Sequence, residues 1–229
     1  MMQTPKKDKN VFYVGLLSFF GGISQDVFTP IFPLYLTSVL GFNKSFIGIA
    51  EGVVTAGAYL FKVIAGFFSD KFNKQKPIIF TGYFLSMVAR PLLVLVSSGA
   101  AIVGLRLVDG AGKGIKDPAK DVLIAGSGQK ETRGRSFGIA RMLDTLGSVA
   151  GPLILFGLLY VFRDSASLYH LILLFTAVPL LITLLVLVFK VKEIDRTPLP
   201  DAKAGVPEKI VLPKSFYFFL GITVLFTLG

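Results

Sequence analysis

Long apolar runs are the sequence feature that most limits what this chain can fold into. Six of them are close to or above the roughly 20 residues that an α-helix needs to cross the hydrocarbon layer of a membrane. With 53% apolar residues among 229, the chain carries more apolar surface than a soluble domain of this size can bury. We therefore expect an all-α membrane protein, because a helix satisfies its own backbone hydrogen bonds in lipid. The six expected spans are 11–40, 46–69, 77–98, 100–124, 136–162 and 168–189.

The connections between these spans carry basic residues unevenly. Lysines and arginines gather in the N-terminus and in the second, fourth and sixth connections, whereas the opposite side has only Lys44 and Arg163. Basic residues favour the cytoplasmic side, so we expect a multi-pass protein of the inner (plasma) membrane with a cytoplasmic N-terminus. The net charge of +10 then reports topology, and we expect no nucleic-acid partner, no cofactor and no bound metal.

The chain divides into four parts by composition. Residues 1–10 form a basic cytoplasmic N-terminus, 11–190 a six-helix transmembrane part, and 191–213 a charged, Pro-rich cytoplasmic linker. Residues 214–229 begin a seventh apolar run of about 15 residues, or roughly 22 Å of helix, which is shorter than a bilayer. We therefore expect a truncated seventh span and a second half of the protein beyond this sequence.

The stretch RLVDGAGKGIKDPAKD, residues 106–121, places charges inside the fourth expected span. At 100° per residue, its charged side chains share one face of a helix and its apolar side chains share the other. Pro118 is expected to end or kink this helix. The charged residues are Arg106, Asp109, Lys113, Lys116, Asp117, Lys120 and Asp121.

Such a charged stripe cannot face lipid. A central Arg, Lys or Asp costs about 2.5–3.5 kcal/mol on insertion scales, and each Leu, Ile or Val returns only about 0.3–0.6 kcal/mol. Ion pairs of Arg106 or Lys113 with Asp109, or of either cation with Asp144, are one explanation of the stripe. Pairing alone is a costly way to hold helices together, so we favour a polar transport pathway.

The first expected span has a polar face as well. Gln25, Asp26 and Thr29 share it, and Pro30 and Pro33 are expected to interrupt the helix. An ionisable residue within a span is a functional candidate by default, which makes Asp26 the first candidate to carry a proton. The first and fourth spans are corresponding members of two three-helix units, as expected when inverted repeats enclose a substrate site at mid-membrane.

The remaining ionisable residues extend this set. Glu51 of the second span and Asp109 are further candidate proton carriers, and Arg141 and Asp144 are expected to pair locally because three residues separate them. The candidates for transport or proton coupling are Asp26, Glu51, Arg106, Asp109, Lys113 and Asp144. The candidates that line a cavity are Gln25 and Thr29.

Three motifs resemble the major facilitator superfamily. The loop GFFSDKFNKQKP, residues 66–77, closely resembles the cytoplasmic signature of this family, with Asn73 in place of a glycine. Asparagine also tolerates the left-handed conformation, so the turn is kept. The fourth span resembles the family's Arg-x-x-x-Gly-x-Gly pattern, and GSVAGP, residues 147–152, resembles the fifth-span motif of its drug–proton antiporter branch. That motif usually continues with small residues, whereas Leu153 follows here.

The resemblance implies the N-terminal six-helix half of a major facilitator fold, made of two inverted three-helix repeats, plus the start of span seven. It implies a secondary active transporter that moves small molecules by alternating access, with proton-coupled efflux as one form of that activity. The implied partners are a small-molecule substrate, protons, the lipid bilayer and the missing C-terminal half of the same protein.

The resemblance also implies roles for single residues. Arg106 would take part in proton coupling, and Gly147, Gly151 and Pro152 would form a bend of the fifth span. Close small-xxx-small packing is the alternative explanation for the two glycines. The residues that would form a cytoplasmic gate are Gly66, Asp70, Lys71, Lys74 and Lys76.

Two functions from other classes are alternatives. A membrane-embedded, metal-dependent phosphotransferase could use Asp117 and Asp121, although Lys113, Lys116 and Lys120 would repel the cation. A membrane scaffold without transport activity would assign no function to the ionisable residues of the spans, so their neutral replacements would be harmless or stabilising.

The basic connections predict which side of the membrane each loop occupies. Because the sequence contains no cysteine, single cysteines can be introduced at Lys74, Gln129 and Lys203 without background labelling. We expect a membrane-impermeant thiol reagent to reach all three only from the cytoplasmic side. Labelling of any of the three in intact cells would contradict the topology.

Overall fold

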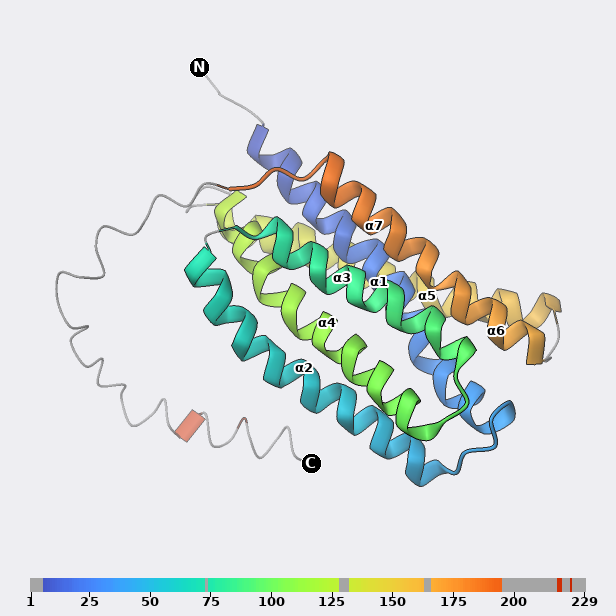
Figure 1. Ribbon diagram of the computed structural model, residues 1–229. Coiled ribbons are helices and arrows are strands. Elements are labelled where there is room, and N and C mark those ends of the chain that lie inside the picture. Colours follow the sequence, from blue (N-terminus) through green and yellow to red (C-terminus); the bar gives the residue numbers. More distant parts are fainter. Residues whose placement is uncertain are drawn as a thin grey trace, which may run out of the picture. The chain divides into compact units, whose positions relative to one another are not determined.

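The computed structural model describes residues 6–72, 74–127, 132–162, 166–194, 218–219 and 223. The chain separates into two units, of which Met1–Asp195 contains all the helices discussed below. The helices run side by side within this unit (Figure 1), and the described residues contain no β-strand. The helices are α1 (Lys6–Ser38), α2 (Lys44–Phe72), α3 (Lys76–Leu92), α4 (Gly99–Ser127), α5 (Arg133–Phe162), α6 (Ala166–Phe175) and α7 (Ala177–Phe189).

The expected all-α architecture with six spans is confirmed, with one change in the sixth. The sixth span divides into α6 and α7 at Thr176. Pro179 explains the break, because proline lacks the N–H that would bond the carbonyl of Phe175 four residues earlier. Most of the expected start of a seventh span, residues 214–229, lies outside the described residues.

Length and composition separate α4 from the other spans. Among the described residues, five helical segments are long and apolar enough to cross a membrane, and they correspond to α1, α2, α3, α5 and α6 with α7. With 29 residues, α4 is also long enough, at about 43 Å. It differs because its sequence carries the charged stripe.

The prolines do not end the helices as expected. Pro30 and Pro33 lie inside the continuous helix α1, and Pro118 lies inside α4, which continues to Ser127. Membrane helices tolerate proline because neighbouring helices and local adjustments compensate for the freed carbonyl groups. The expectation that Pro30 and Pro33 interrupt the first span was therefore wrong, and of the two outcomes expected at Pro118, an end of the helix is excluded.

The helix contacts follow the two-repeat arrangement. The most extensive contacts are those of α2 with α4 and of α1 with α5. If α1–α3 and α4–α7 are two related units, these are equivalent pairs, each joining the first helix of one unit to the second helix of the other. The contacts of α3 with α4 and of α7 with α1 are equivalent in the same way.

Glycines make the two main helix pairs possible. A Cβ on Gly110 would lie 2.5 Å from the carbonyl oxygen of Val54, and one on Gly114 would collide with the carbonyl oxygen of Ala58. On the other pair, a Cβ on Gly147 would collide with the carbonyl oxygen of Phe19. Small residues let two helix backbones approach this closely in a membrane.

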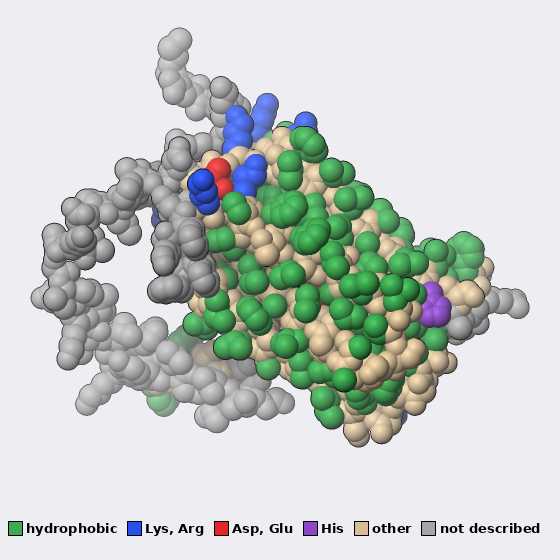
Figure 2. All heavy atoms as spheres, viewed as in Figure 1, with side chains coloured by type: hydrophobic (Ala, Val, Ile, Leu, Met, Phe, Trp, Pro, Cys, Tyr) green, Lys and Arg blue, Asp and Glu red, His purple; other side chains and the backbone are tan. Residues whose placement is uncertain are grey.

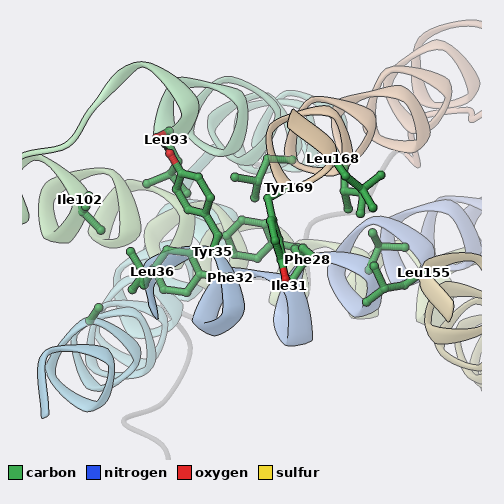
Figure 3. Close-up of a cluster of buried hydrophobic side chains, with 14 of the residues drawn as sticks. Phe28, Ile31, Phe32, Tyr35, Leu36, Leu93, Ile102, Leu155, Leu168 and Tyr169 are labelled. Atoms are coloured by element: carbon green, nitrogen blue, oxygen red, sulfur yellow. Dashed lines mark hydrogen bonds between the residues drawn. The ribbon is translucent and has the colours of Figure 1, made fainter. Parts of the chain in front are cut away.

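A hydrophobic cluster fills the space around the second half of α1 (Figure 3). Phe28, Ile31 and Phe32 pack there against side chains from the neighbouring helices. Tyr35 and Tyr169 are also buried in this cluster, and the Tyr35 hydroxyl donates a 3.4 Å hydrogen bond to the Leu93 carbonyl.

The outer surface agrees with a membrane environment. Figure 2 shows hydrophobic side chains spread over the visible face of the described residues and Lys and Arg side chains gathered at one end. Large apolar side chains are exposed on α2 and α5, for example Val63 and Phe156. In water such a surface would cause aggregation, whereas lipid tails can cover it.

The close approach of α1 and α5 predicts a stability difference between two glycines of one helix. We expect Gly147→Ala to lower the melting temperature in detergent, because overpacking against a backbone atom costs about 1–3 kcal/mol. Gly138→Ala is the matched control, since a Cβ there has no atom within 4 Å and alanine gains about 1 kcal/mol of helix propensity. Equal melting temperatures for the two variants would contradict the close contact.

Candidate functional site

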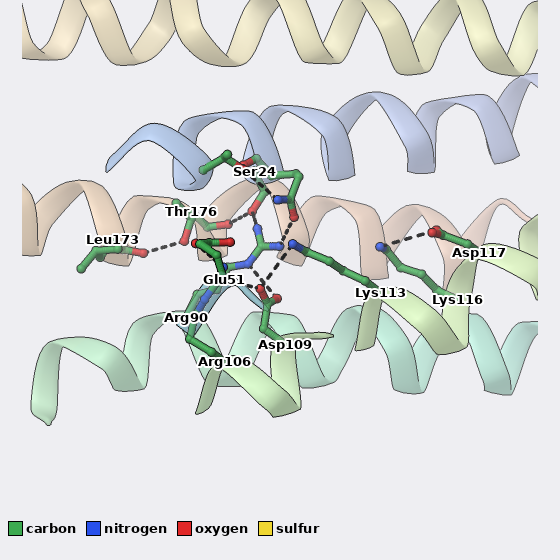
Figure 4. Close-up of polar contacts among 12 residues, drawn as sticks. Ser24, Glu51, Arg90, Arg106, Asp109, Lys113, Lys116, Asp117, Leu173 and Thr176 are labelled. Carbon is green, nitrogen blue, oxygen red and sulfur yellow. Dashed lines mark hydrogen bonds and ion pairs between the residues drawn. The ribbon is translucent and has the colours of Figure 1, made fainter. Parts of the chain in front are cut away.

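A buried carboxylate lies at the centre of the polar interior. Asp109 on α4 is only 1% exposed, and three cations approach it (Figure 4). Its Oδ1 atom lies 3.1 Å from Nε of Arg90, and its Oδ2 atom lies 3.1 Å from Nη1 of Arg106 and 3.8 Å from Nζ of Lys113. A buried carboxylate needs such partners, because desolvation of an unpaired charge is very costly.

Arg90 on α3 connects this carboxylate to α1. Its Nη1 donates to the hydroxyl of Ser24 and its Nη2 to Oε1 of Gln25, each at 2.7 Å. The Ser24 hydroxyl in turn donates to the Thr176 carbonyl at the break between α6 and α7, at 2.7 Å. The fork of the guanidinium group therefore joins three helices, and Ser24 connects it to the break in the sixth span.

Sequence reasoning missed this role of Arg90. Arg90 was not among the candidates from the sequence; it lies near the end of α3, which ends at Leu92 and is followed by a 3₁₀ turn at Leu93–Leu95. The available signal was an arginine inside an apolar run, which in a membrane span indicates an internal partner. Its partners could not be deduced, because they lie on α1 and α4.

Arg106 on α4 is buried to the same degree. Its Nη2 donates to Oε1 of Glu51 on α2 at 2.6 Å, and its guanidinium carbon lies 4.3 Å from the ring centre of Phe32 and 4.9 Å from that of Phe28. The faces of the aromatic rings stabilise the cation in place of water. Arg106 therefore lies between the aromatic cluster and two carboxylates, one of which, Glu51, is partly exposed at 39%.

A polar cavity of about 430 Å³ lies beside this charge cluster. Side chains of α1, α3, α4 and α5 contribute most of its wall, and Lys62 of α2 and Leu180 of α7 complete it. The acidic residues of the wall are Asp26, Asp117, Asp121 and Asp144, and the basic ones are Lys62, Arg90, Lys113, Lys116, Lys120 and Arg141. A cavity of this size can hold a small molecule.

The candidates from the sequence fall into two groups around this cavity. Asp26, Lys113, Asp144 and Gln25 line it, whereas Arg106, Asp109 and Glu51 form the ion-paired cluster behind it and are not among the lining residues. Thr29 is exposed and hydrogen-bonds Gln25 at 2.8 Å, but it is not part of the described cavity wall.

The ion pairs within α4 and α5 include pairs considered from the sequence. The expected Arg141–Asp144 pair is present, with Nη1 3.2 Å from Oδ2. Pairing of Arg106 and Lys113 with Asp109 is also present, so pairing and a polar cavity coexist. Among the described residues, Asp26 forms no ion pair.

The expected gate loop is described only in part. A Cβ added to Gly66 would have no atom within 4 Å, and Lys74 is exposed. The side chains of Asp70 and Lys71 lie outside the described residues, as does the whole of Asn73. The Nζ atom of Lys76 donates to the Val188 carbonyl at 3.4 Å. The role of this loop as a gate therefore stays a prediction.

Glu193, after α7, stabilises the start of α3, which sequence reasoning did not predict. Its two carboxylate oxygens accept the backbone N–H groups of Gln75 and Lys76, each at 2.9 Å. These are among the N–H groups that a helix N-terminus leaves without an intrahelical partner. At the same end, the side chain of Asn10 bonds the Ser127 hydroxyl at 2.7 Å and both backbone groups of Lys192.

Comparison with known proteins identifies the family. Residues 14–229 match the family model described as Major Facilitator Superfamily. An uncharacterized MFS-type transporter of Methanocaldococcus jannaschii is 34% identical over 226 residues, which are 96% of this chain and 54% of that protein. The melibiose permease of Enterobacter cloacae is 27% identical over 146 residues, 59% of this chain and 34% of the permease. The chain spans about half the length of the first of these relatives.

Solved structures share the fold. The nucleoside transporter NupG, in a mutant form, has a TM-score of 0.72 at 16% identity, covering 91% of this chain and 50% of that one. A bacterial homologue of the human lysosomal transporter Spinster, in an inward-facing conformation, has a TM-score of 0.68 at 15% identity, covering 96% and 50%. With the family match over most of its length, this chain belongs to the Major Facilitator Superfamily of membrane transporters.

Proposed function

We propose that the protein is a secondary active transporter that moves small molecules by alternating access, and that the polar cavity is its part of the substrate site. The observation that supports this is a cavity of about 430 Å³ with ten charged residues in its wall, inside a bundle whose outer surface is apolar. Charged residues inside a membrane bundle are costly in free energy, and ion pairing alone is a poor reason to keep them there.

The proposed mechanism requires a second helical bundle opposite this one. In alternating access, one bundle rocks against another around a site at mid-membrane. The relatives' greater length supports a second bundle in this protein as well. The membrane orientation, with the N-terminus and the gate loop in the cytoplasm, is part of the same proposal.

We include proton coupling, carried by carboxylates that water can reach. Asp109 is sealed by its three cations, whereas Glu51 is partly exposed and Asp26 lines the cavity. Protonation of Glu51 would remove one of the two carboxylates that hold Arg106, leaving Asp109 to compensate three cations. A change of charge at Glu51 therefore alters the ion pairs that join α2, α3 and α4.

The direction of transport does not follow from the fifth-span motif. The resemblance of residues 147–152 to the antiporter branch suggested efflux. The contact of Gly147 with the Phe19 backbone, and of Gly151 with α1, accounts for these glycines by packing alone. The proposal therefore includes proton coupling, but it does not use this motif to assign import or export.

The phosphotransferase alternative has little support in the site. Oδ1 of Asp117, one of its two proposed metal ligands, lies 3.7 Å from Nζ of Lys116 and 4.0 Å from Nζ of Lys120. Within the described ranges, no group of three His, Cys, Asp or Glu side chains is arranged to hold a metal.

Neutral replacements of the two accessible acids test the coupling. The protein, expressed from its natural gene and reconstituted in proteoliposomes, would first be screened for solute transport with and without a pH gradient. We expect Glu51→Gln and Asp26→Asn each to abolish accumulation driven by the gradient while leaving exchange without a gradient partly intact. Each variant keeps its shape but fixes the neutral form.

A third variant controls for the loss of a carboxylate elsewhere. Glu193→Gln removes an acid that lies outside the cavity, so gradient-driven accumulation should persist. If both Glu51→Gln and Asp26→Asn accumulate solute at the normal rate, neither is the proton carrier. If the normal protein moves no solute under any condition, the transport proposal itself fails.

A further inference from the structure

Three lysines of α4 lie inside a span, where the rule that places basic residues in cytoplasmic connections does not explain them. Lys113, Lys116 and Lys120 are spaced three and four residues apart and therefore share one face of the helix. Lys113 is the middle residue of the 29-residue helix, about 21 Å from either end. The side chains of Lys113, Lys116 and Lys120 are only 20%, 15% and 14% exposed, and all three line the cavity. We call this group the lysine stripe.

The carboxylates near the lysine stripe compensate it incompletely. Among the described residues, Lys113 has only Asp109 within ion-pair distance, at 3.8 Å, and that carboxylate already accepts shorter bonds from Arg90 and Arg106. Lys116 and Lys120 share one carboxylate, that of Asp117, at 3.7 and 4.0 Å. These separations exceed hydrogen-bond length, so the contacts are only coulombic.

The hydrogen-bond donors of two of these lysines are unused. Lys120 donates to the Ser18 hydroxyl at 3.0 Å, but Lys113 and Lys116 make no hydrogen bond within the described part of the chain. Lys116 additionally lies 5.2 Å from the ring centre of Tyr83. An ammonium group has three donors and is costly to leave unsatisfied away from bulk water. Both groups are therefore prepared to accept a ligand of opposite charge.

Most of the other charged groups of the wall are already paired, and among the acids Asp121 and Asp144 interact with the stripe only through Lys120. Arg90 uses Nε, Nη1 and Nη2 on Asp109, Ser24 and Gln25, so its fork has little capacity left. Asp144 is paired with Arg141. The acids left without an ion pair among the described residues are Asp26 and Asp121. A cationic solute would have to bind among six basic side chains.

We propose that the lysine stripe binds the transported solute, and that this solute is a small organic anion carrying a phosphate or carboxylate group. This inference rests on the proposed transport function, because it assigns the substrate class of that same cavity. Two lysines whose Cα atoms are about 4.5 Å apart along the helix axis, on one face of the helix, suit a doubly charged headgroup, since lysine binds phosphate as a point charge without the planar geometry that arginine requires.

Matched probes test the charge requirement directly. The protein, expressed from its natural gene and held in nanodiscs at constant ionic strength, would be titrated calorimetrically with glycerol 3-phosphate and with uncharged glycerol. Succinate and inorganic phosphate would be titrated in parallel to separate carboxylate from phosphate and headgroup from scaffold. We expect binding of at least one anion and none of glycerol. Absence of binding for all three anions, or equal binding of glycerol, would overturn the proposal.

Substitutions then locate the site. Because a charge-assisted hydrogen bond is roughly twice as strong as a neutral one, we expect Lys113→Gln and Lys116→Gln each to lower the affinity for the anion by roughly tenfold or more. Lys116→Arg, which keeps the charge, should retain most of the affinity. Lys44→Gln removes an exposed lysine at the start of α2 and should bind normally.

The outcomes separate this inference from the transport proposal. Unchanged affinity in both glutamine variants would show that the anion binds elsewhere. If either glutamine variant does not fold, the arginine variant and the probe series on the unaltered protein still decide the question. Uptake of a neutral or cationic solute, unaffected by Lys113→Gln, would leave transport standing and overturn the anion site. Anion binding that depends on the lysine stripe, without any transport in proteoliposomes, would support the anion site and overturn the transport proposal.

Discussion

The polar interior of this bundle depends on one buried carboxylate, Asp109. It accepts Arg90 from α3 and Arg106 from its own helix, both at 3.1 Å, in a place where water does not reach. An arginine buried without a carboxylate would be prohibitively costly, and so would the carboxylate without its arginines. Through Arg90 the cluster extends to Ser24 and Gln25 of α1. Three long helices are thus held in register by charges that are individually unfavourable in a membrane.

Such a cluster requires backbones that approach one another closely. The glycines of α4 lie against the carbonyl groups of Val54 and Ala58, which brings α2 near enough for Glu51 to reach Arg106 at 2.6 Å. The equivalent contact of Gly147 with Phe19 draws α5 onto α1 and places Asp144 beside Gly22 in the cavity wall. The small residues and the charged residues of the family motifs therefore belong to one arrangement. The glycines set the distances over which the charges can pair.

The sequence was sufficient for the spans, the charged stripe and the family, because these depend on local composition and short motifs. Periodicity correctly placed the charged residues of α4 on one face, and the Arg141–Asp144 pair followed from their spacing. Proline chemistry in isolation failed for Pro30 and Pro33, since a membrane bundle tolerates prolines that would interrupt an isolated helix. Arg90 and Glu193 could not be assigned, because each acts on partners that are close only after folding. The Glu193 carboxylate, for example, accepts a backbone N–H 118 residues away in the chain.

The two proposals for this cavity are connected by its charge. An acid of the wall such as Asp26, when ionised, offsets the lysine stripe; when protonated, it leaves the lysines more strongly positive towards an anion. Proton binding and anion binding would then favour each other, and by linkage the effect would be equal in both directions. Asp109 cannot take this part, because it is sealed among its three cations, and its charge is needed to keep Arg90 and Arg106 buried. The bundle therefore separates its carboxylates by access to water: Asp109 is buried among its cations, whereas Asp26 lines the cavity and Glu51 is partly exposed, which is where the proposed proton exchange would take place.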